Sequence, residues 1–239
     1  MLKIFVIVFT LLSLKTFALS NLEFSRFGVK EGLSQDSIID IVKTRDGRIW
    51  LATQSGLNVY NGYTVKVYKS NKNDPKTIAN DFVYTLQEDK RGLLWAGTRT
   101  GVSRFDPKKE SFKNYYYFQD GNQETELGEV TDIYSDKDGN LWLATWGQGL
   151  VQYDYPSDSF KKVRLASGQL PSKYVKTIVK DLNNNFLIGF STAPFLRHEG
   201  AGMIKLDENL NILATYNKDN SPLTNNDVSS LMVAKNGDA

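Results

Sequence analysis

The segment Asp46-Gly47-Arg48-Ile49-Trp50-Leu51-Ala52-Thr53 returns twice along the sequence, and this repetition indicates the fold of the chain. The second copy is Arg91-Gly92-Leu93-Leu94-Trp95-Ala96-Gly97-Thr98, and the third is Asp138-Gly139-Asn140-Leu141-Trp142-Leu143-Ala144-Thr145. The tryptophans are 45 and then 47 residues apart, a period too long for leucine-rich or ankyrin repeats. The chain is therefore expected to consist of repeated units, each with a tryptophan at a fixed place.

Two weaker copies follow the three strong ones. In the fourth copy, Asn184 replaces the glycine of the turn and Leu187 replaces the tryptophan. Asparagine tolerates a positive φ better than most residues, so the turn is expected to survive. A fifth copy begins at Val228 and reaches Ala239, which makes about four and a half repeats in 239 residues.

Pairs of apolar residues three positions apart precede each turn and favour strands over helices. They are Ile38 and Ile41, Val83 and Leu86, Val130 and Ile133, Val175 and Ile178, and Val228 and Leu231. These segments are short, rich in β-branched residues and closed by Asp, Asn or Gly, which leaves no room for helical repeats, the alternative. In the first copy, strands are expected at 38–43, 48–53, 57–61 and 64–69. Four short antiparallel strands per repeat predict an all-β fold, an incomplete β-propeller of four-stranded blades.

The N-terminal segment differs from the rest of the chain. Residues 1–20 combine an early lysine, an apolar run over 4–12 and small residues, which is typical of a secretory signal peptide cleaved after Ser20; an uncleaved anchor is the alternative. Residues 22–27 are rich in strand formers and are expected to supply the outer strand of the final blade.

The charge and cysteine counts exclude some classes of partner. The chain has 29 basic and 27 acidic residues, and removing residues 1–20 takes away two lysines, which leaves no net charge and no electrostatic reason to expect a nucleic-acid partner. It has no cysteine, which excludes disulfides and thiolate metal sites.

The repeats resemble the two-component regulator propeller repeat family. The matching residues are Gly32-Leu33-Ser34, Gly47 with Ile49-Trp50, Gly92 with Leu94-Trp95, Gly139 with Leu141-Trp142, and the closing pairs Gly56-Leu57, Gly101-Val102 and Gly149-Leu150. The resemblance covers residues 24–239 and implies one propeller domain over 21–239. Its repeats are expected near 32–69, 77–116, 127–164, 170–216 and 223–239.

This resemblance implies the periplasmic sensor region of a receptor of the hybrid histidine kinase or diguanylate cyclase type. A membrane span, which would anchor the receptor in the inner membrane, and an output module are expected beyond residue 239. The implied partner is an unknown periplasmic ligand, with carbohydrate as the family-level expectation, and the family is compatible with a homodimer of the full-length receptor. We expect no cofactor and no enzymatic activity of the propeller itself.

Positions at which the repeats disagree are the candidate ligand site. On a propeller, the loop after each second strand and the segment leading into the next inner strand share one face, and the glycine turns share the other. The candidates on the first face are Gln54, Arg99, Trp146 and Gln148. Trp146 lies outside the repeated register, in a loop one residue longer than its counterparts, and its ring could stack on a sugar; packing on a neighbouring blade is the alternative. Trp50, Trp95 and Trp142 are expected in the core.

The fourth repeat carries an enlarged loop between Phe190 and Gly202. Arg197 and His198 in this loop are further ligand-site candidates. One histidine without cysteines does not make a zinc site, so no metal site is expected.

Carboxylates recur once per blade at Asp106, Asp154 and Asp207. Such recurrence favours residues that shape turns over the paired carboxylates of a glycosidase.

Three functions remain open from the residues alone. The first is a ligand-sensing module, the second an exported propeller enzyme of the polysaccharide lyase type, and the third a protein-interaction propeller. An enzyme needs a base on one face, for which the chain offers a lone histidine or a Tyr or Arg side chain. A protein-interaction propeller needs only a wide flat face.

Overall fold

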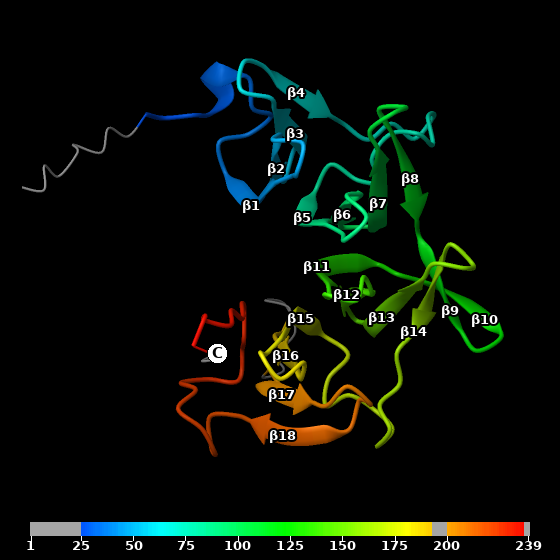
Figure 1. Cartoon of the computed structure of the whole chain (residues 1–239), viewed down its shortest axis with the longest axis vertical. Coiled ribbons are helices and arrows are strands. Elements are labelled where there is room, and N and C mark those ends of the chain that lie inside the picture. The colour runs from blue at the N-terminus through cyan, green and yellow to red at the C-terminus, as the bar shows by residue number, and fades with distance from the viewer. Residues whose placement is uncertain (1–24, 193–199, 237–239) are drawn as a thin grey trace, which may run out of the picture.

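The computed structural model describes residues 25–192 and 200–236, in which four antiparallel sheets follow one another along the chain (Figure 1). The first sheet contains β1 (Ile38–Lys43), β2 (Ile49–Thr53), β3 (Gly56–Tyr60) and β4 (Val65–Tyr68), and the second contains β5 (Val83–Glu88), β6 (Leu94–Thr98), β7 (Gly101–Asp106) and β8 (Ser111–Tyr115). The third contains β11 (Glu129–Ser135), β12 (Leu141–Trp146), β13 (Gly149–Asp154) and β14 (Ser159–Lys162), and the fourth contains β15 (Val175–Lys180), β16 (Phe186–Phe190), β17 (Met203–Leu206) and β18 (Ile212–Tyr216). A short 3-10 helix, Val29–Glu31, precedes them.

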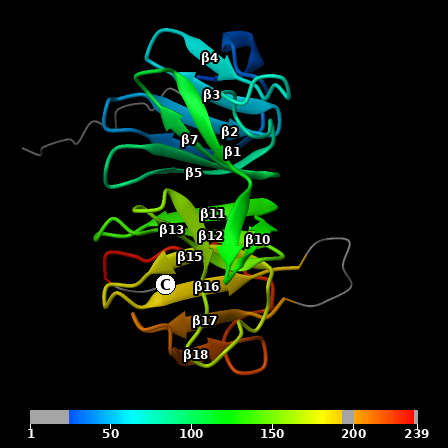
Figure 2. The same ribbon diagram turned by 90° about the vertical axis from the view of Figure 1, so that its right-hand side faces the viewer.

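The sheets form an arc in which the first strand of each sheet lies innermost (Figure 1). Figure 2 shows that the innermost strands of the four sheets, β1, β5, β11 and β15, are oriented along nearly the same axis. The four strands given above for each sheet are ordered as in the sequence, so each set of four is a blade made of consecutive hairpins. This arrangement is an incomplete β-propeller, and the predicted fold class is confirmed.

The glycine turns behave as their sequence predicts. Gly47, Gly92 and Gly139 have φ values of 87°, 81° and 87° between the first and second strands of their blades. Asn184 has a φ of 64° at the equivalent place in the fourth blade. The turn therefore survives without glycine because asparagine enters the left-handed region more readily than other side chains.

Tryptophans on the second strands fill the spaces between blades. Trp50 and Trp95 are fully buried and Trp142 is 7% exposed, which confirms the core assignment. Each indole meets an aromatic ring of the next blade edge to face, with centroids 4.9 Å apart for Trp50 and Phe105 and 4.8 Å apart for Trp142 and Phe186. Such aromatic pairs bury large apolar areas, so the repeat register itself specifies blade stacking.

Glycines on two of the second strands face a valine from the next part of the chain. A Cβ placed on Gly97 would lie 3.0 Å from Cγ1 of Val130, and one placed on Gly189 would lie 2.7 Å from Cγ1 of Val228. Val228 is buried and its N–H donates to the Phe190 carbonyl, so it takes the place of an inner-strand valine.

The predicted fifth repeat is only partly formed among the described residues. Among the described residues, 217–236 contain no strand, although Val228 is seated against the fourth blade. A lone segment becomes a strand only where a neighbour accepts its ladder of hydrogen bonds, and no such hairpin partner is described here. The outer strand expected at 22–27 lies partly outside the described residues, and 25–27 are not a strand.

One hairpin was not predicted. β9 (Tyr117–Asp120) and β10 (Gln123–Glu126) lie between the second and third blades in sequence and attach to the outer edge of the third. β9 pairs with β14 in parallel, with Gln119 opposite Lys161, so the third sheet has six strands. Figure 1 shows the hairpin extending from the rim of the propeller. The hairpin covers an outer strand whose edge would otherwise be open.

Candidate ligand-binding face

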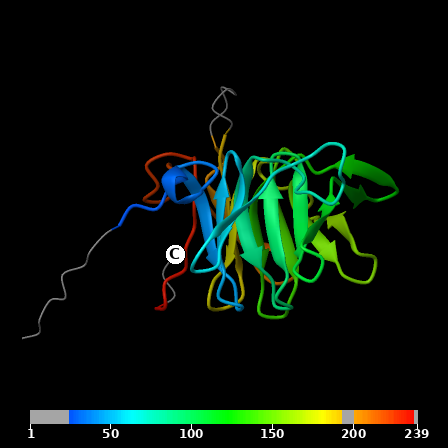
Figure 3. The ribbon, with the colours of Figure 1, turned by 90° about the horizontal axis from the view of Figure 1, so that it is seen from above.

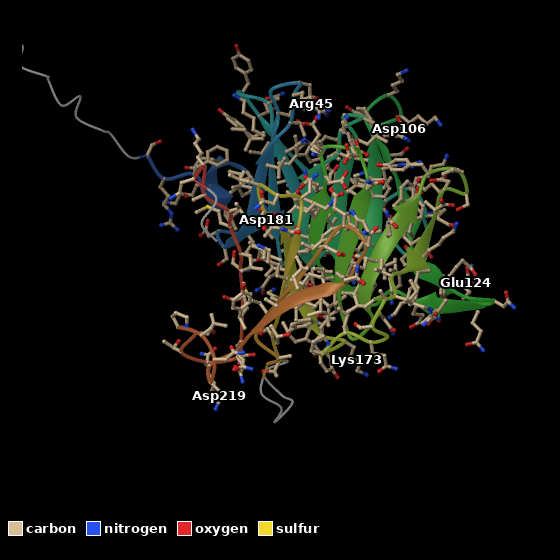
Figure 4. The ribbon with its side chains drawn as sticks, turned by 60° about the horizontal axis from the view of Figure 1, so that its bottom comes forward. Arg45, Asp106, Glu124, Lys173, Asp181 and Asp219 are labelled. Carbon is tan, nitrogen blue, oxygen red and sulfur yellow. The ribbon has the colours of Figure 1, made fainter. Side chains whose placement is uncertain are left out.

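The two ends of the blades carry different kinds of loop. The turns that follow the second strands and the segments that lead into the inner strands lie at one end, and the glycine turns lie at the other (Figure 3). Figure 4 places Lys173, which precedes β15, at one end of the blades. Arg45, in the β1–β2 turn, and Asp106, at the end of β7, lie at the opposite end. We call the end that carries Lys173 the loop face.

Arg99 joins a polar cluster on the loop face. It lies in the β6–β7 turn, and its Nε is 3.6 Å from Oε1 of Glu129, the first residue of β11. The hydroxyl of Tyr84 donates to Oε2 of the same carboxylate at 2.9 Å. Burial and this hydrogen bond raise the pKa of Tyr84 to about 12, so its phenol remains a proton donor at neutral pH.

Trp146 lies next to this cluster. In the β11–β12 pair its Cα is the partner of Glu129, and its ring centroid is 5.7 Å from that of Tyr174. Trp146 is half-buried, so it packs on the segment leading into the fourth blade and keeps part of its ring accessible. The residues Tyr84, Arg99, Glu129, Trp146 and Tyr174 thus form one continuous row across three blades, which we call the aromatic strip.

The hydrogen bonds that close the turns after the second strands show that the loop at Trp146 is one residue longer than its counterparts. The buried hydroxyls of Thr53 and Thr98 donate to the carbonyls of Gly56 and Gly101, three residues further on. The hydroxyl of Thr145 donates to the carbonyl of Gly149, four residues further on. The extra residue is therefore accommodated in the turn while the strands keep their register.

The other predicted site residues are more scattered. Gln54 is exposed in the β2–β3 turn of the first blade and makes no hydrogen bond with the aromatic strip in the described part of the chain. The carbonyl of Gln148 accepts a hydrogen bond from the Lys162 ammonium, at the edge of a separate cavity. Arg197 and His198 lie outside the described residues.

A groove of about 360 Å³ adjoins Arg99. Its walls are formed by Thr100, Glu126 and the two tyrosines at the base of the unpredicted hairpin. Tyr116 is 42% and Tyr117 46% exposed, so their rings are available to a ligand. The hairpin therefore adds aromatic surface to the loop face.

Sequence reasoning missed Tyr84, Glu129, Tyr174 and the tyrosines of the groove. The signal for three of them was present, because the positions beside the first apolar residue of each inner strand differ between repeats, while that residue itself is always Ile or Val. Arg99 and Trp146 are predicted by the same criterion, which is that the residue type differs from repeat to repeat. The groove tyrosines had no such signal, since they precede a hairpin that interrupts the repeat.

The recurring aspartates shape turns. Asp106 accepts hydrogen bonds from the backbone N–H groups of Lys108 and Lys109, and Asp207 accepts them from Asn209 and Asn211. Asp154 bonds the Ser157 hydroxyl within its own turn. Their carboxylates are thus engaged in local structure.

Comparison with known families agrees with the repeat geometry. Residues 32–55, 77–100 and 127–147 match the family described as two component regulator propeller. These stretches are two-component regulator propeller repeats. Each contains one of the tryptophan hairpins of the first three blades.

Several proteins are similar to this repeat region. A segment of 75 residues is 40% identical to histidine kinase P4 of Formosa agariphila, covering 31% of this chain and 6% of the kinase. The extracellular domain of a hybrid two-component system of B. thetaiotaomicron superposes with a TM-score of 0.73 and 22% identity, covering 89% of this chain and 28% of that domain. Virginiamycin B lyase of Staphylococcus aureus superposes with a TM-score of 0.53 and 12% identity, over 76% of this chain and 55% of the lyase. The two structural similarities show the fold, and the chain spans less than a third of the kinase and of the extracellular domain.

No helix within residues 25–192 and 200–236 has the length and apolar character needed to cross a membrane.

Proposed function

We propose that this propeller region is the ligand-sensing part of a periplasmic signal-transduction receptor and has no catalytic role of its own. The observation that carries the proposal is the aromatic strip, which joins Arg99, Glu129 and Tyr84 to Trp146 and Tyr174 across three blades. The two-component regulator propeller repeats and the histidine kinase relative support the receptor context.

The chemistry of the strip suits a hydroxylated ring such as a sugar. The rings of Trp146 and Tyr174 offer apolar faces for stacking, and the Tyr84 hydroxyl, the Arg99 guanidinium and the Glu129 carboxylate offer hydrogen-bonding groups close by. The side chains of Arg99 and Glu129 are 61% and 34% exposed. An ion pair this exposed contributes little to stability, so its placement is more readily explained by recognition than by folding.

A ligand on the strip would act on the arrangement of the blades. The strip takes its residues from β5, the β6–β7 turn, β11, β12 and the residue before β15, so one bound molecule would contact three blades. A ligand shifts a conformational equilibrium only by its difference in affinity for the two states. We propose that a difference in blade spacing supplies this difference and reaches an output module, a kinase or a diguanylate cyclase, elsewhere in the receptor.

An enzymatic function of the lyase type is less well supported. The phenol nearest to a carboxylate on this face is Tyr84, and its pKa of about 12 keeps it protonated near neutral pH. A general base works best when its pKa lies near the working pH. Tyr84 is thus better suited to donate a hydrogen bond than to remove a proton.

Fluorescence and calorimetry test this function. Trp146 is half-buried whereas Trp50, Trp95 and Trp142 are buried, so a ligand on the strip should change the emission of Trp146 alone. Neutral mono- and disaccharides titrated into the full chain should give a saturable emission change that Trp146→Ala removes. Affinity measured by calorimetry should fall at least about tenfold in Trp146→Ala and Arg99→Ala.

The matched control is Tyr63→Ala. Tyr63 is 93% exposed in the β3–β4 turn, at the end of the first blade opposite to the loop face. Equal affinities for Trp146→Ala and Tyr63→Ala, with any sugar that binds the wild-type chain, would rule out the strip as the ligand site.

A further inference from the structure

A second, more enclosed cavity lies on the loop face beside the aromatic strip. Its volume is about 440 Å³, and it lies between the end of β14 and the segment that connects the third and fourth blades. Its charged and amide side chains are Asp120, Gln148, Lys162, Arg164, Gln169 and Lys173. We call this cavity the Lys162 pocket.

The Lys162 pocket has an excess of positive charge. It contains three cationic side chains and one carboxylate, and that carboxylate, Asp120, is paired with Arg164. Within the described residues, the ammonium groups of Lys162 and Lys173 have no carboxylate at ion-pairing distance. Two positive charges in this cavity therefore have no ion-pair partner among the described residues, although Asp120 is near enough to act on Lys162.

Lys162 is held in place by structure on three sides. Its Nζ donates to the Gln148 carbonyl and lies 5.5 Å from the centre of the Phe118 ring. It also lies 3.7 Å from the position that a Cβ on Gly149 would occupy, so the absence of a side chain there leaves room for the ammonium.

The surroundings of Lys162 favour a counter-ion. Burial and the charge of Arg164 lower its pKa, and Asp120 opposes this effect only in part. An ammonium has three donors, and the Gln148 carbonyl takes one of them. A bound anion would accept the remaining donors and offset the desolvation of the charge.

The pocket and the strip share one piece of backbone. The Lys173 carbonyl accepts hydrogen bonds from Gly147 and Gly149, which flank Gln148 in the loop after Trp146. Lys173 also directly precedes Tyr174, so each residue of the Trp146 and Tyr174 pair continues into the wall of the pocket. A single ligand could place a ring on the strip and a charged substituent in the pocket.

We propose that the Lys162 pocket binds the oxyanion group, a carboxylate or a sulfate ester, of a soluble ligand whose ring stacks on Trp146 and Tyr174. This inference rests on the proposed ligand-binding role of the loop face and adds the charge of the ligand. Lys162 and Lys173 supply the charge, and Arg164 is the cation already neutralised by Asp120.

Calorimetry with three related probes tests the pocket. Glucuronate carries a carboxylate, glucose 6-sulfate carries a sulfate ester, and glucose carries neither. At low salt we expect one or both anions to bind the full chain, with an affinity that falls at least about tenfold in Lys162→Gln and in Lys173→Gln and weakens as salt is added. The anion that binds more tightly identifies the source of the charge.

Two further variants serve as controls. Lys108→Gln removes one positive charge from the turn after β7, at the end opposite to the loop face, and should leave the affinity unchanged. Lys162→Met keeps the length of the side chain without its charge, so a matching loss of affinity there, with an unaltered melting temperature, attributes the effect to charge and not to misfolding.

The outcomes separate this inference from the proposed function. If neither anion binds at millimolar concentration, or if Lys162→Gln binds as tightly as Lys108→Gln, the pocket proposal is wrong. If glucose still changes the emission of Trp146 in that case, the aromatic strip remains the ligand site. If the anions bind in a Lys162-dependent manner and Trp146→Ala has no effect on their affinity, the pocket stands as a site and the stacking role of the strip is wrong.

Discussion

The interface between the second and third blades and the interface between the third and fourth use the same apolar design with different polar links. In the first, the indole of Trp95 donates at 2.9 Å to Asp89 of its own blade, inside the core. In the second, Nε1 of Trp142 is buried without a hydrogen-bond partner in the described chain, and Asp136, at the place of Asp89, bonds the Lys180 ammonium at 3.1 Å. Tryptophan burial is thus shared by both interfaces, and the hydrogen bond is not.

The outer parts of the two interfaces differ as well. Asp158, on the third blade, receives hydrogen bonds from Arg104, Lys113, Tyr115 and Tyr153. At the equivalent turn of the fourth blade stands Leu210, which packs against an apolar cluster. A residue at positive φ is present in both turns, with φ of 47° and 64°. The repeat therefore fixes the turn, and the side chain at its tip decides whether neighbouring blades are joined by charges or by apolar contact.

Truncating the tryptophans should have the largest effect on stability. We expect Trp95→Ala to lower the free energy of unfolding by about 3–5 kcal/mol, because it leaves a large cavity. It also removes the indole donor from Oδ2 of the buried Asp89, whose Oδ1 keeps the N–H groups of Arg91 and Leu93. Trp142→Ala should cost less, since its indole makes no such bond. Urea denaturation of both variants measures the difference, and an equal loss would show that the Trp95 bond contributes nothing net.

The next largest loss of stability should follow from adding a Cβ to Gly97, where the second and third blades approach each other closely. Gly97→Ala would place that atom 2.9 Å from the Val130 carbonyl oxygen and 2.6 Å from Cγ2 of Thr85. We expect it to destabilise the fold by about 3 kcal/mol through overpacking. The corresponding position of the second interface is Ala144, so Ala144→Gly should cost only about 1 kcal/mol. If Gly97→Ala melted at the wild-type temperature, the close approach of these blades would be disproved.

The buried carboxylate of Asp132, at the second interface, should make the free energy of unfolding depend on pH. Asp132 accepts the N–H of Ile178 at 2.9 Å, and burial raises its pKa from 3.8 to about 6. The folded state then holds this proton while the unfolded state loses it, so this group makes stability fall as pH rises from about 4 to about 6, on the order of 2 kcal/mol. Thermal melting of Asp132→Asn should show a weaker fall than wild type over that range. The equivalent residue of the first interface is Thr85, which does not titrate.

The smallest change in stability should come from Asp158, which accepts the hydrogen bonds at the outer part of the first interface. Burial alone would raise the pKa of Asp158, but the hydrogen bonds from Lys113, Tyr153 and Tyr115 lower it well below 3.8. Its contribution is therefore present above pH 3.8 and lost as pH falls through lower values. The side chain is 38% exposed, so we expect Asp158→Asn to cost only about 1 kcal/mol at pH 7. Chemical denaturation at pH 7 and pH 3 should show this difference shrinking at the lower pH.

Much of the fold was predictable because its determinants are local. The glycine or asparagine of each turn, the tryptophan or leucine three residues later and the short strands around them lie within one hairpin, so pattern alone located them. The hairpin of β9 and β10 was not predicted, since it occurs once and its pairing with β14 is not encoded by any repeat. Of the ligand-site candidates, Arg99 and Trp146 lie in the aromatic strip, Gln148 lines the Lys162 pocket, and Gln54 belongs to another blade.

The amino-acid pattern is enough to define the blade, with its length, its turns and the residue that fills its core, because each depends on contacts between neighbours in the chain. Which residues come together as a site depends on how the blades pack. Tyr84 and Glu129 are 45 residues apart in sequence, and their hydrogen bond exists only because consecutive blades stack side by side. A repeat pattern records what every blade has in common, whereas a binding site is made of what differs between blades and of the distances that their packing sets.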